Sequence, residues 1–205
     1  MKLNSLYSYF LIFALFISIS TFSSCDSKEK LNEGTTEETT ETLNTDQQAP
    51  TKFTTLDEMV TDLGDYSAEN NTYEKISDTK IRISPGIAAS ADDVQAQEIV
   101  KVSLISMALR TFIHTDLNEI TIKVVPQKAS MNPEDADMIE KYTQEATVTR
   151  QKAQEVVKQY TGTDLNSLVG NKIGDLFRAD MPNDNMEKLR STENTSAVFA
   201  ALTGK

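Results

Sequence analysis

Few side chains in this 205-residue sequence are suited to acid–base, nucleophilic or metal chemistry. The sequence contains one histidine, His114, and one cysteine, Cys25. A pair of histidines on one metal is therefore excluded, and a Ser/His or Cys/His dyad would need His114. His114 falls at the C-terminal end of an expected helix, four residues after Arg110. We expect a solvent-facing cation there, favoured by the helix dipole, rather than a general base.

Two acidic stretches carry the oxygen ligands that calcium prefers. They contain Glu134, Asp135, Asp137 and Glu140 in the first and Asp180, Asn183, Asp184 and Asn185 in the second. Calcium loops alternate their ligands around a glycine turn and end in a bidentate glutamate, which neither stretch does. The first is typical of a helix start after Pro133, and the second of a turn at Pro182. We expect no metal site and no cofactor.

The sequence signatures of common enzyme classes are also missing. The sequence has no Walker loop, Gly-x-Gly-x-x-Gly, Cys-x-x-Cys, Gly-x-Ser-x-Gly or His-Glu-x-x-His pattern. The stretch "GNKIG", residues 170–174, has the glycine spacing of a membrane-helix contact, but it lies among polar residues and is predicted to be a turn. Carboxylates are too numerous for one catalytic pair to be singled out. We expect that the protein is not an enzyme.

The elements that would position these side chains lie in residues 51–205, which have the composition of a globular domain. About 155 residues is close to the commonest size of a single domain, so we expect one. The predicted elements are a helix over 56–63, strands over 79–84 and 118–127 with a helix over 91–114 between them, a third strand over 142–149, a helix from Thr149 to Gly162, and short helices within 164–177 and 185–202.

Local signals support these assignments. Thr55 and Glu58 form a capping box, and Gly64 ends the first helix. Alternating apolar residues mark the strands at 79–84 and 118–127. A helix from Asn132 onward competes with the third strand. In the 91–114 helix, the second half is expected in the core and the first half partly exposed. The fold class is α+β, a small mixed sheet of two or three strands with helices packed on it.

The residues before the domain form two parts of different composition. Residues 1–24 carry one charge, Lys2, followed by an apolar run over 6–22 and then Ser23 and Ser24. This three-part order is typical of a secretory signal peptide. The apolar run is slightly shorter than a transmembrane helix needs and is interrupted by serines and a threonine, although an uncleaved anchor is an alternative.

The stretch "FSSC", residues 22–25, resembles the lipobox of bacterial lipoproteins. The resemblance covers residues 1–25. It implies that the sulfur of Cys25 takes a diacylglyceryl group and that a signal peptidase then cuts before Cys25. Cys25 would thus become the first residue of the mature protein and carry acyl chains such as palmitate. Two or more acyl chains would anchor the protein stably. The alternative is a structural or reactive thiol, but a single cysteine cannot form an intramolecular disulfide. We expect a lipid anchor on Cys25.

Residues 25–50 combine the lipidation site with an acidic segment of almost no apolar content. Such a segment cannot bury enough surface to offset its ordering entropy, so we expect a disordered tether. Its mean span would be roughly 27 Å and its extended reach roughly 85 Å. It is either a spacer that lets the domain meet a partner or a solvated linker of no particular length.

These features predict an envelope lipoprotein anchored to a membrane through Cys25, with the outer membrane favoured. The net charge of −11 argues against nucleic acid as a partner. The leading hypothesis is a non-enzymatic protein-interaction or adaptor domain with an envelope protein as its partner. The alternatives are a module that binds a small apolar or sugar ligand between sheet and helix and, less favoured, an enzyme that uses carboxylates.

Overall fold

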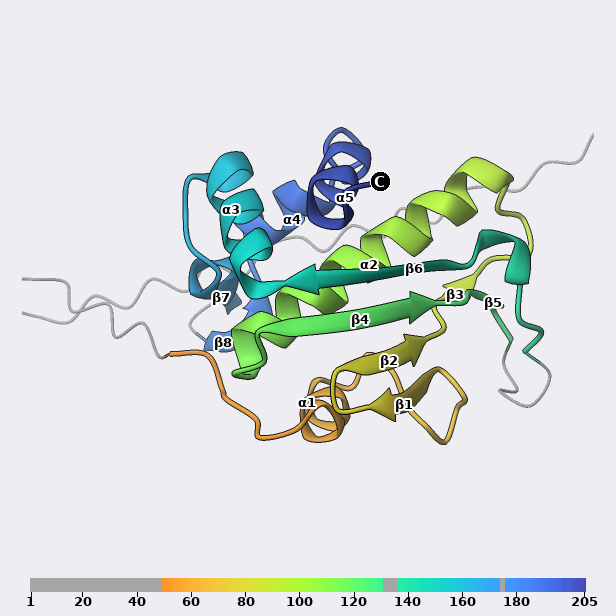
Figure 1. The fold of residues 1–205 in the computed structure, drawn as a ribbon, viewed down its shortest axis with the longest axis horizontal. Coiled ribbons are helices and arrows are strands. Elements are labelled where there is room, and N and C mark those ends of the chain that lie inside the picture. The colour runs from red at the N-terminus through yellow and green to blue at the C-terminus, as the bar shows by residue number, and fades with distance from the viewer. Residues whose placement is uncertain (1–48, 131–135, 174–175) are drawn as a thin grey trace, which may run out of the picture. The chain divides into compact units, whose positions relative to one another are not determined.

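The computed structural model describes residues 49–130, 136–173 and 176–205. Its centre is a four-stranded mixed sheet in the order β1-β2-β4-β6 (Figure 1). The strands are β1 (Tyr73–Ser77), β2 (Lys80–Ile83), β4 (Glu119–Val124) and β6 (Gln144–Thr149). The predicted signal peptide, the lipidation site Cys25 and most of the predicted tether lie outside the described residues.

Neighbouring strands of this sheet pair in both directions. β2 and β4 are parallel, and the outer pairs β1–β2 and β4–β6 are antiparallel. The α+β class and the mixed sheet are therefore confirmed, and the third predicted strand exists as β6. The prediction of two or three strands missed β1, of which only Tyr73 is buried. A strand with one buried residue shows no alternation of apolar and polar side chains.

The parallel pair continues beyond a proline in each strand. β3 (Gly86–Ile87) pairs with β5 (Gln127–Lys128). Between the two pairs, the Val125 amide donates to the Ile83 carbonyl and the Gln127 amide to the Pro85 carbonyl, both at 3.0 Å. Because proline lacks an amide donor, Pro85 and Pro126 divide one long ladder into two short ones.

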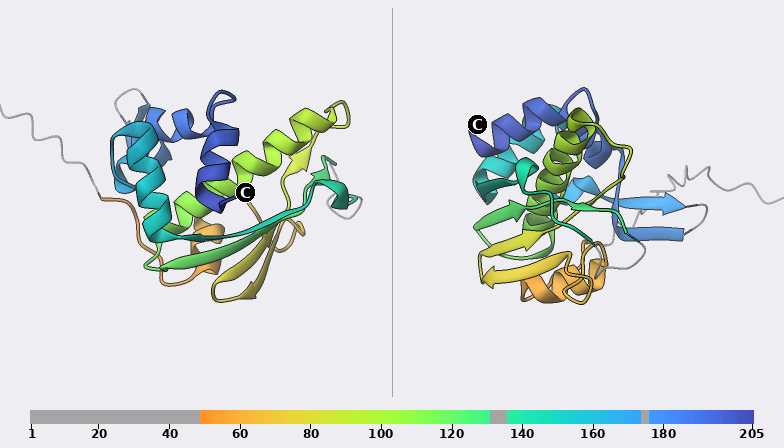
Figure 2. Two further views of the ribbon diagram at one scale, coloured as in Figure 1. Left: turned by 45° about the horizontal axis from the view of Figure 1, so that its top comes forward. Right: turned by 90° about the vertical axis from the view of Figure 1, so that its right-hand side faces the viewer.

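The sheet has one apolar and one polar face. In β4, Ile120, Ile122 and Val124 are buried and alternate with more exposed polar residues. The opposite face carries polar pairs such as Thr121 with Thr147, whose hydroxyls are 2.8 Å apart. Figure 2 shows the helices gathered on the apolar face. This two-layer arrangement is the usual way for a half-apolar antiparallel or mixed sheet to bury its core.

The longest helix, α2 (Asp93–His114), connects the parallel strands β2 and β4 across the apolar face. It begins two residues later than predicted, with Asp92 as N-cap and Gln95 completing a capping box. Val94, in the first turn, is 76% exposed, whereas the residues from Leu104 to Ile113 are mostly buried. The expected contrast between its two halves is confirmed.

The shorter helices complete the layer. α1 (Leu56–Leu63) and α3 (Arg150–Thr161) have the predicted caps and end at Gly64 and Gly162, both with positive φ. α4 (Asp184–Arg190) and α5 (Thr195–Thr203) confirm the short helices predicted within 185–202. The largest fully buried side chains are Met59, Ile81, Ile83, Leu104, Ile105, Leu109, Phe112, Ile113, Ile120, Ile122, Leu168 and Met186.

The helix predicted within 164–177 is wrong. After one turn of 3-10 helix (Asn166–Leu168), the chain forms an antiparallel hairpin of β7 (Val169–Ile173) and β8 (Leu176–Pro182), which projects from the molecule in Figure 2. The turn predicted at "GNKIG" is also wrong, because most of it lies in β7. A register shift falls between Val169 and Asn171, and Gly170 has a φ of 91°. Glycine at a bulge adopts this angle without strain, whereas it weakens a helix.

The helix considered as an alternative from Asn132 onward is reduced, among the described residues, to one short turn before β6. Residues 131–135, where the predicted start after Pro133 would lie, are outside the described residues. The described residues 136–139 are not helical, and a 3-10 turn (Glu140–Tyr142) leads directly into β6.

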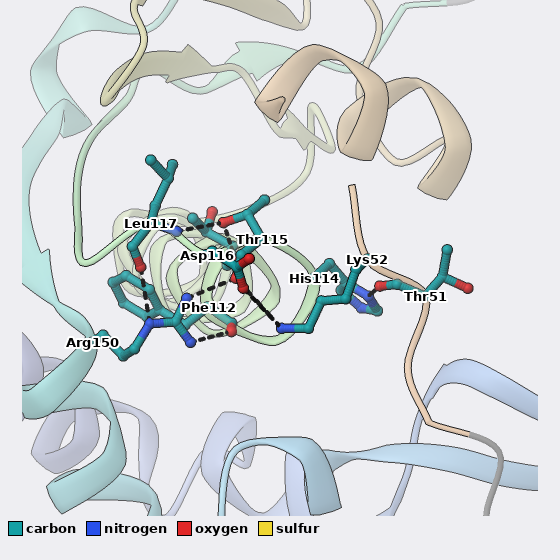
Figure 3. A network of polar contacts seen from close by, with 9 residues as sticks. Thr51, Lys52, Phe112, His114, Thr115, Asp116, Leu117 and Arg150 are labelled. Atoms are coloured by element: carbon teal, nitrogen blue, oxygen red, sulfur yellow. Dashed lines mark hydrogen bonds and ion pairs between the residues drawn. The ribbon is translucent and has the colours of Figure 1, made fainter. Parts of the chain in front are cut away.

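The C-terminal end of α2 is capped by a side chain from α3 (Figure 3). The Arg150 guanidinium donates to three backbone carbonyls, those of Phe112 at 2.6 Å, Thr115 at 2.7 Å and Leu117 at 3.0 Å. It also lies over the Phe112 ring, 5.3 Å from the ring centroid. The last carbonyls of a helix have no intrahelical partner and carry partial negative charge. A fixed guanidinium supplies the missing hydrogen-bond donors and also a favourable positive charge.

We expect Arg150→Ala to lower the free energy of unfolding by about 2–4 kcal/mol, because three carbonyls lose a charged donor in a partly buried place. Arg150→Lys should recover part of this loss, since an ammonium keeps the charge but lacks the planar set of donors. Urea unfolding followed by circular dichroism measures both. Gln151→Ala, at the exposed next position of α3, is the control, and an equal effect of the two alanine variants would contradict the capping role.

Candidate functional site

His114 is buried, which contradicts the expectation of a solvent-facing cation. Its side chain is 0% exposed. Its Nδ1 lies 2.9 Å from the Thr51 carbonyl oxygen, and its own backbone carbonyl accepts a hydrogen bond from the Phe53 amide at 2.7 Å. The expectation that His114 faces solvent failed because the chain before α1 covers this side of α2. That segment gives no periodic signal of its own.

Asp180 of β8 holds the same segment from the other side. Its carboxylate accepts hydrogen bonds from the Thr51 amide at 2.8 Å and the Thr51 hydroxyl at 2.7 Å. The Asp180 carboxylate is also 3.7 Å from the His114 Nδ1. We call Thr51, His114 and Asp180 the N-terminal latch, because they join the start of the described chain to the end of α2 and to β8. Figure 3 shows the contact between Thr51 and His114.

The imidazole of the latch is held in its neutral form. Burial lowers the pKa of His114, against the smaller raising effects of the Thr51 carbonyl and Asp180, while the cations Arg110 and Lys52 lower it further. The contact with the Thr51 carbonyl assigns the proton to Nδ1. Nε2 is buried and has no hydrogen-bond partner within the part of the chain that the structure describes. A nitrogen enclosed in this way cannot exchange protons with a bound substrate, so His114 has a structural role.

The acidic stretches are not brought together. Asp180 belongs to the latch, Asp137 pairs with Lys128 at 3.0 Å, and Asp184 lies in the first turn of α4, which Asn183 caps. Glu140 accepts from the Thr143 hydroxyl, and Glu134 and Asp135 lie outside the described residues. Within residues 49–130, 136–173 and 176–205, no three His, Cys, Asp or Glu side chains are placed to hold a metal ion.

A polar cleft of about 360 Å³ lies beside α2 and is the best candidate for a binding site. One wall is a single side of α2, where Ser103, Ser106, Met107 and Arg110 follow one another at helical spacing. The other walls come from the loop after α1, the start of β1, the junction of β2 and β3, and the end of α4. They contribute Asp65, Tyr66, Thr72, Ser84, Pro85, Gly86 and Arg190. We call this the arginine cleft.

Two guanidinium groups dominate the charge of the arginine cleft. Arg110, whose side chain is 13% exposed, pairs with Asp65. Arg190 pairs with Glu187 and donates to the Ser106 hydroxyl at 3.3 Å. Burial, and then the nearby charge of Arg190, lower the pKa of Arg110. Arginine nevertheless stays charged in proteins, so both groups are fixed cations.

Hydroxyl groups surround these cations. The Tyr66 side chain is hydrogen-bonded to the Ser103 side chain. Burial raises the pKa of the Tyr66 phenol, which is therefore neutral and able to donate a hydrogen bond. Thr72 exchanges hydrogen bonds with Ser67, and Ser84 accepts from Arg82. The Thr72 and Ser84 hydroxyls donate to the Ser67 carbonyl and to Met138 Sδ, so the donors available to a ligand are the two guanidinium groups and the Tyr66 phenol.

A second, more apolar hollow of about 580 Å³ lies at the start of α2. Ala91, Val94 and Ile99 line it from α2 and the residues just before that helix, with Ala88 and Thr192 beside them. Ser90, Gln95 and Glu98 also line it, but most of its exposed surface is apolar, and it gives no indication of the chemistry of a ligand.

Comparison with protein-family models, with curated proteins and with solved structures found no significant match. Of the helices in the described ranges, none has the length and apolar character to cross a membrane.

Sequence reasoning missed the arginine cleft for a definable reason. Ser103, Ser106 and Arg110 form a polar side on a helix that is otherwise largely buried, and this pattern could have been read from their spacing. Arg190 lies 80 positions further along the sequence. No local signal connects it to α2, because only the packing of α4 brings it there.

We expect the free energy of unfolding to decrease as the pH falls below about 6.5, the ordinary pKa of histidine in an unfolded chain. The folded-state pKa of His114 is lowered, so the unfolded chain binds the proton first and acid favours unfolding. The loss continues until the pH reaches the folded-state pKa, with a slope of at most about 1.4 kcal/mol per pH unit. Urea unfolding between pH 5 and pH 7.5 measures it.

His114→Gln is the control for this pH dependence, because it removes the only histidine of the sequence. The variant should be less stable at pH 7.5 and should lose most of the dependence between pH 5 and pH 7. An unchanged slope in the variant would show that another group is responsible.

Proposed function

We propose that this protein is an envelope lipoprotein, anchored to a membrane through lipid on Cys25, whose domain acts by binding a partner protein rather than by catalysis. The anchor is supported by the residues "FSSC" at 22–25 and the signal-like run before them. The outer membrane is the favoured location. The acidic segment after Cys25 would place the domain away from the lipid surface, because like charges extend a chain.

The observation that carries the interaction role is the contrast between a filled core and an open polar cleft. The space between the sheet and α2 is occupied by fully buried side chains, among them Ile83, Leu104 and Ile122. No room remains there for the apolar or sugar ligand considered from the sequence. The Arg110 and Arg190 side chains instead line an open cleft beside α2, which a group from a partner can enter.

A catalytic role has less support. His114, the only histidine, is enclosed in the N-terminal latch. The acids nearest the arginine cleft, Asp65 and Glu187, are each engaged by an arginine. The second candidate is a lipoprotein that binds a small polar ligand, because the arginine cleft has the volume of a small-molecule site.

Cross-linking in intact cells, followed by affinity capture and mass spectrometry, tests the proposed function. The tagged wild-type protein should incorporate a labelled palmitate analogue and should yield the same envelope protein in repeated captures. Cys25→Ala should lose both the label and the membrane fraction, and the cross-linked partner should fall at least about tenfold because the tethered concentration is lost.

Three outcomes would contradict parts of this proposal. Label in Cys25→Ala equal to that in the wild type would place the lipid on another residue, and no label in either form would exclude it. No reproducible partner with the anchored form would remove support for the adaptor role and favour the small-ligand candidate.

A further inference from the structure

We propose that the arginine cleft binds a single carboxylate group through Arg110 and Arg190. The carboxylate is either the chain end or an acidic side chain of the partner protein, or a small free carboxylic acid. This inference deepens the proposed function. It rests on that function only for the identity of the molecule that bears the carboxylate, which we call the carrier.

The first argument is the incomplete bonding of Arg110. A guanidinium has five N–H donors arranged in a plane. Asp65 engages one terminal nitrogen, and Nε is buried with no hydrogen-bond partner among the described residues. A largely buried charged group with unmet donors is costly, and a further oxygen acceptor would reduce the cost.

The second argument is the proximity of two like charges. Arg190 lies close enough to lower the pKa of Arg110, so the two cations repel each other. Their paired acids stand apart, Asp65 on the loop after α1 and Glu187 on α4. An anion between the guanidinium groups would interact with both, and hydroxyls of Ser106 and Thr72 line the same space.

The third argument concerns which anion. Arg110 already accommodates a carboxylate, that of Asp65, whose side chain is 45% exposed and comes directly after the glycine that ends α1. An incoming carboxylate would share or replace this contact. Residues 51–205 contain 17 Lys and Arg against 24 Asp and Glu, and this net charge of −7 disfavours polyanions, whose several charges would meet the repulsion of the whole domain. It therefore favours one compact charge.

The competing explanation is that both ion pairs are purely structural. The pair of Arg110 and Asp65 would hold the α1–β1 loop against α2, and Arg190 would hold α4 against α2 through Ser106. Removing either arginine would then change stability, but the cleft would not respond to added carboxylate. A readout at the arginine side chains themselves separates the two explanations.

The test is an NMR titration of the mature lipidated protein in detergent micelles, with ¹⁵N-labelled arginine and the Nε–H signals observed. The probes are sodium acetate, N-acetyl-trialanine with a free carboxylate, the same peptide as its amide, and inorganic phosphate. Sodium chloride keeps the ionic strength equal throughout. The signals of Arg110 and Arg190 are assigned by their disappearance in the Arg→Lys variants.

Acetate and the free peptide should shift the Arg110 and Arg190 signals saturably, and the amide should not. Arg110→Lys should weaken the saturation seen at Arg190 at least about tenfold, the loss expected for a buried hydrogen bond to a charged group. Asp65→Asn should strengthen it about fivefold, the effect of removing one unit charge at about 4 Å in water. A tighter response to the peptide than to acetate supports a polypeptide as the carrier, and an equal response supports a small acid.

Arg82→Lys is the matched control. Arg82 is 12% exposed and pairs with Glu74 at 2.8 Å, so it resembles Arg110 in burial and in its acidic partner. Its other donors are engaged by Asn71 and Ser84, and its guanidinium does not line the cleft. This variant should leave the titration unchanged.

Two results would overturn the inference: shifts no larger with acetate than with chloride, or phosphate binding at least about tenfold tighter than acetate, a difference that would assign the site to another anion class. If the titration fails while cells still yield a cross-linked partner, the proposed interaction role stands and this site does not. If the titration succeeds but cells yield no cross-linked partner, the carboxylate site stands and the proposed interaction role does not.

Discussion

The structure depends on how the long helix α2 ends. Its sides are buried between the sheet and the other helices, so its last carbonyls cannot all be satisfied by water. Arg150 supplies three hydrogen bonds at this end, and the Phe53 amide supplies another to the His114 carbonyl. Two segments far apart in the sequence are thus drawn to one point, and α2 is fixed in position along the sheet.

A fixed α2 determines what lies on its remaining polar side. Arg110 stands one turn before His114, on the same helix that the N-terminal latch and Arg150 hold. The latch fixes the end of α2 by hydrogen bonds at Thr51 and Asp180, while Arg110 faces the arginine cleft. A helix held at its end presents Ser106 and Arg110 with little freedom to move, and a pre-positioned set of donors loses less entropy on binding.

The parts of the fold that were predicted are those with local causes. The capping box at Thr55, the glycine ends at Gly64 and Gly162, and the alternation in β4 each depend on residues within one or two turns or one strand. The sequence therefore predicted most helices, three of the four strands of the main sheet, and the partial exposure of the first half of α2, where Val94 is 76% exposed.

The parts that were missed depend on contacts between distant residues. His114 is buried by a segment some 60 positions earlier, and the hairpin β7–β8 depends on a glycine bulge rather than on periodicity. The arginine cleft needs α2, the β2–β3 junction and α4 together. Function is hardest to predict in this chain because its candidate site arises only from that assembly, whereas the proposed lipid anchor is predicted from four adjacent residues.

The most direct test of the account is photo-cross-linking in living cells from a chosen point on the domain. Gly86 lines the arginine cleft and is exposed, and a Cβ at this position would meet only Ala129, at an ordinary contact distance of 3.7 Å, so a photoreactive residue can replace it. Lys158 on α3 is an exposed control position outside the cleft. The account predicts an adduct with one envelope protein from position 86, little from position 158, and loss of the adduct in Arg110→Lys. Equal adducts from both positions, or none from position 86, would contradict it.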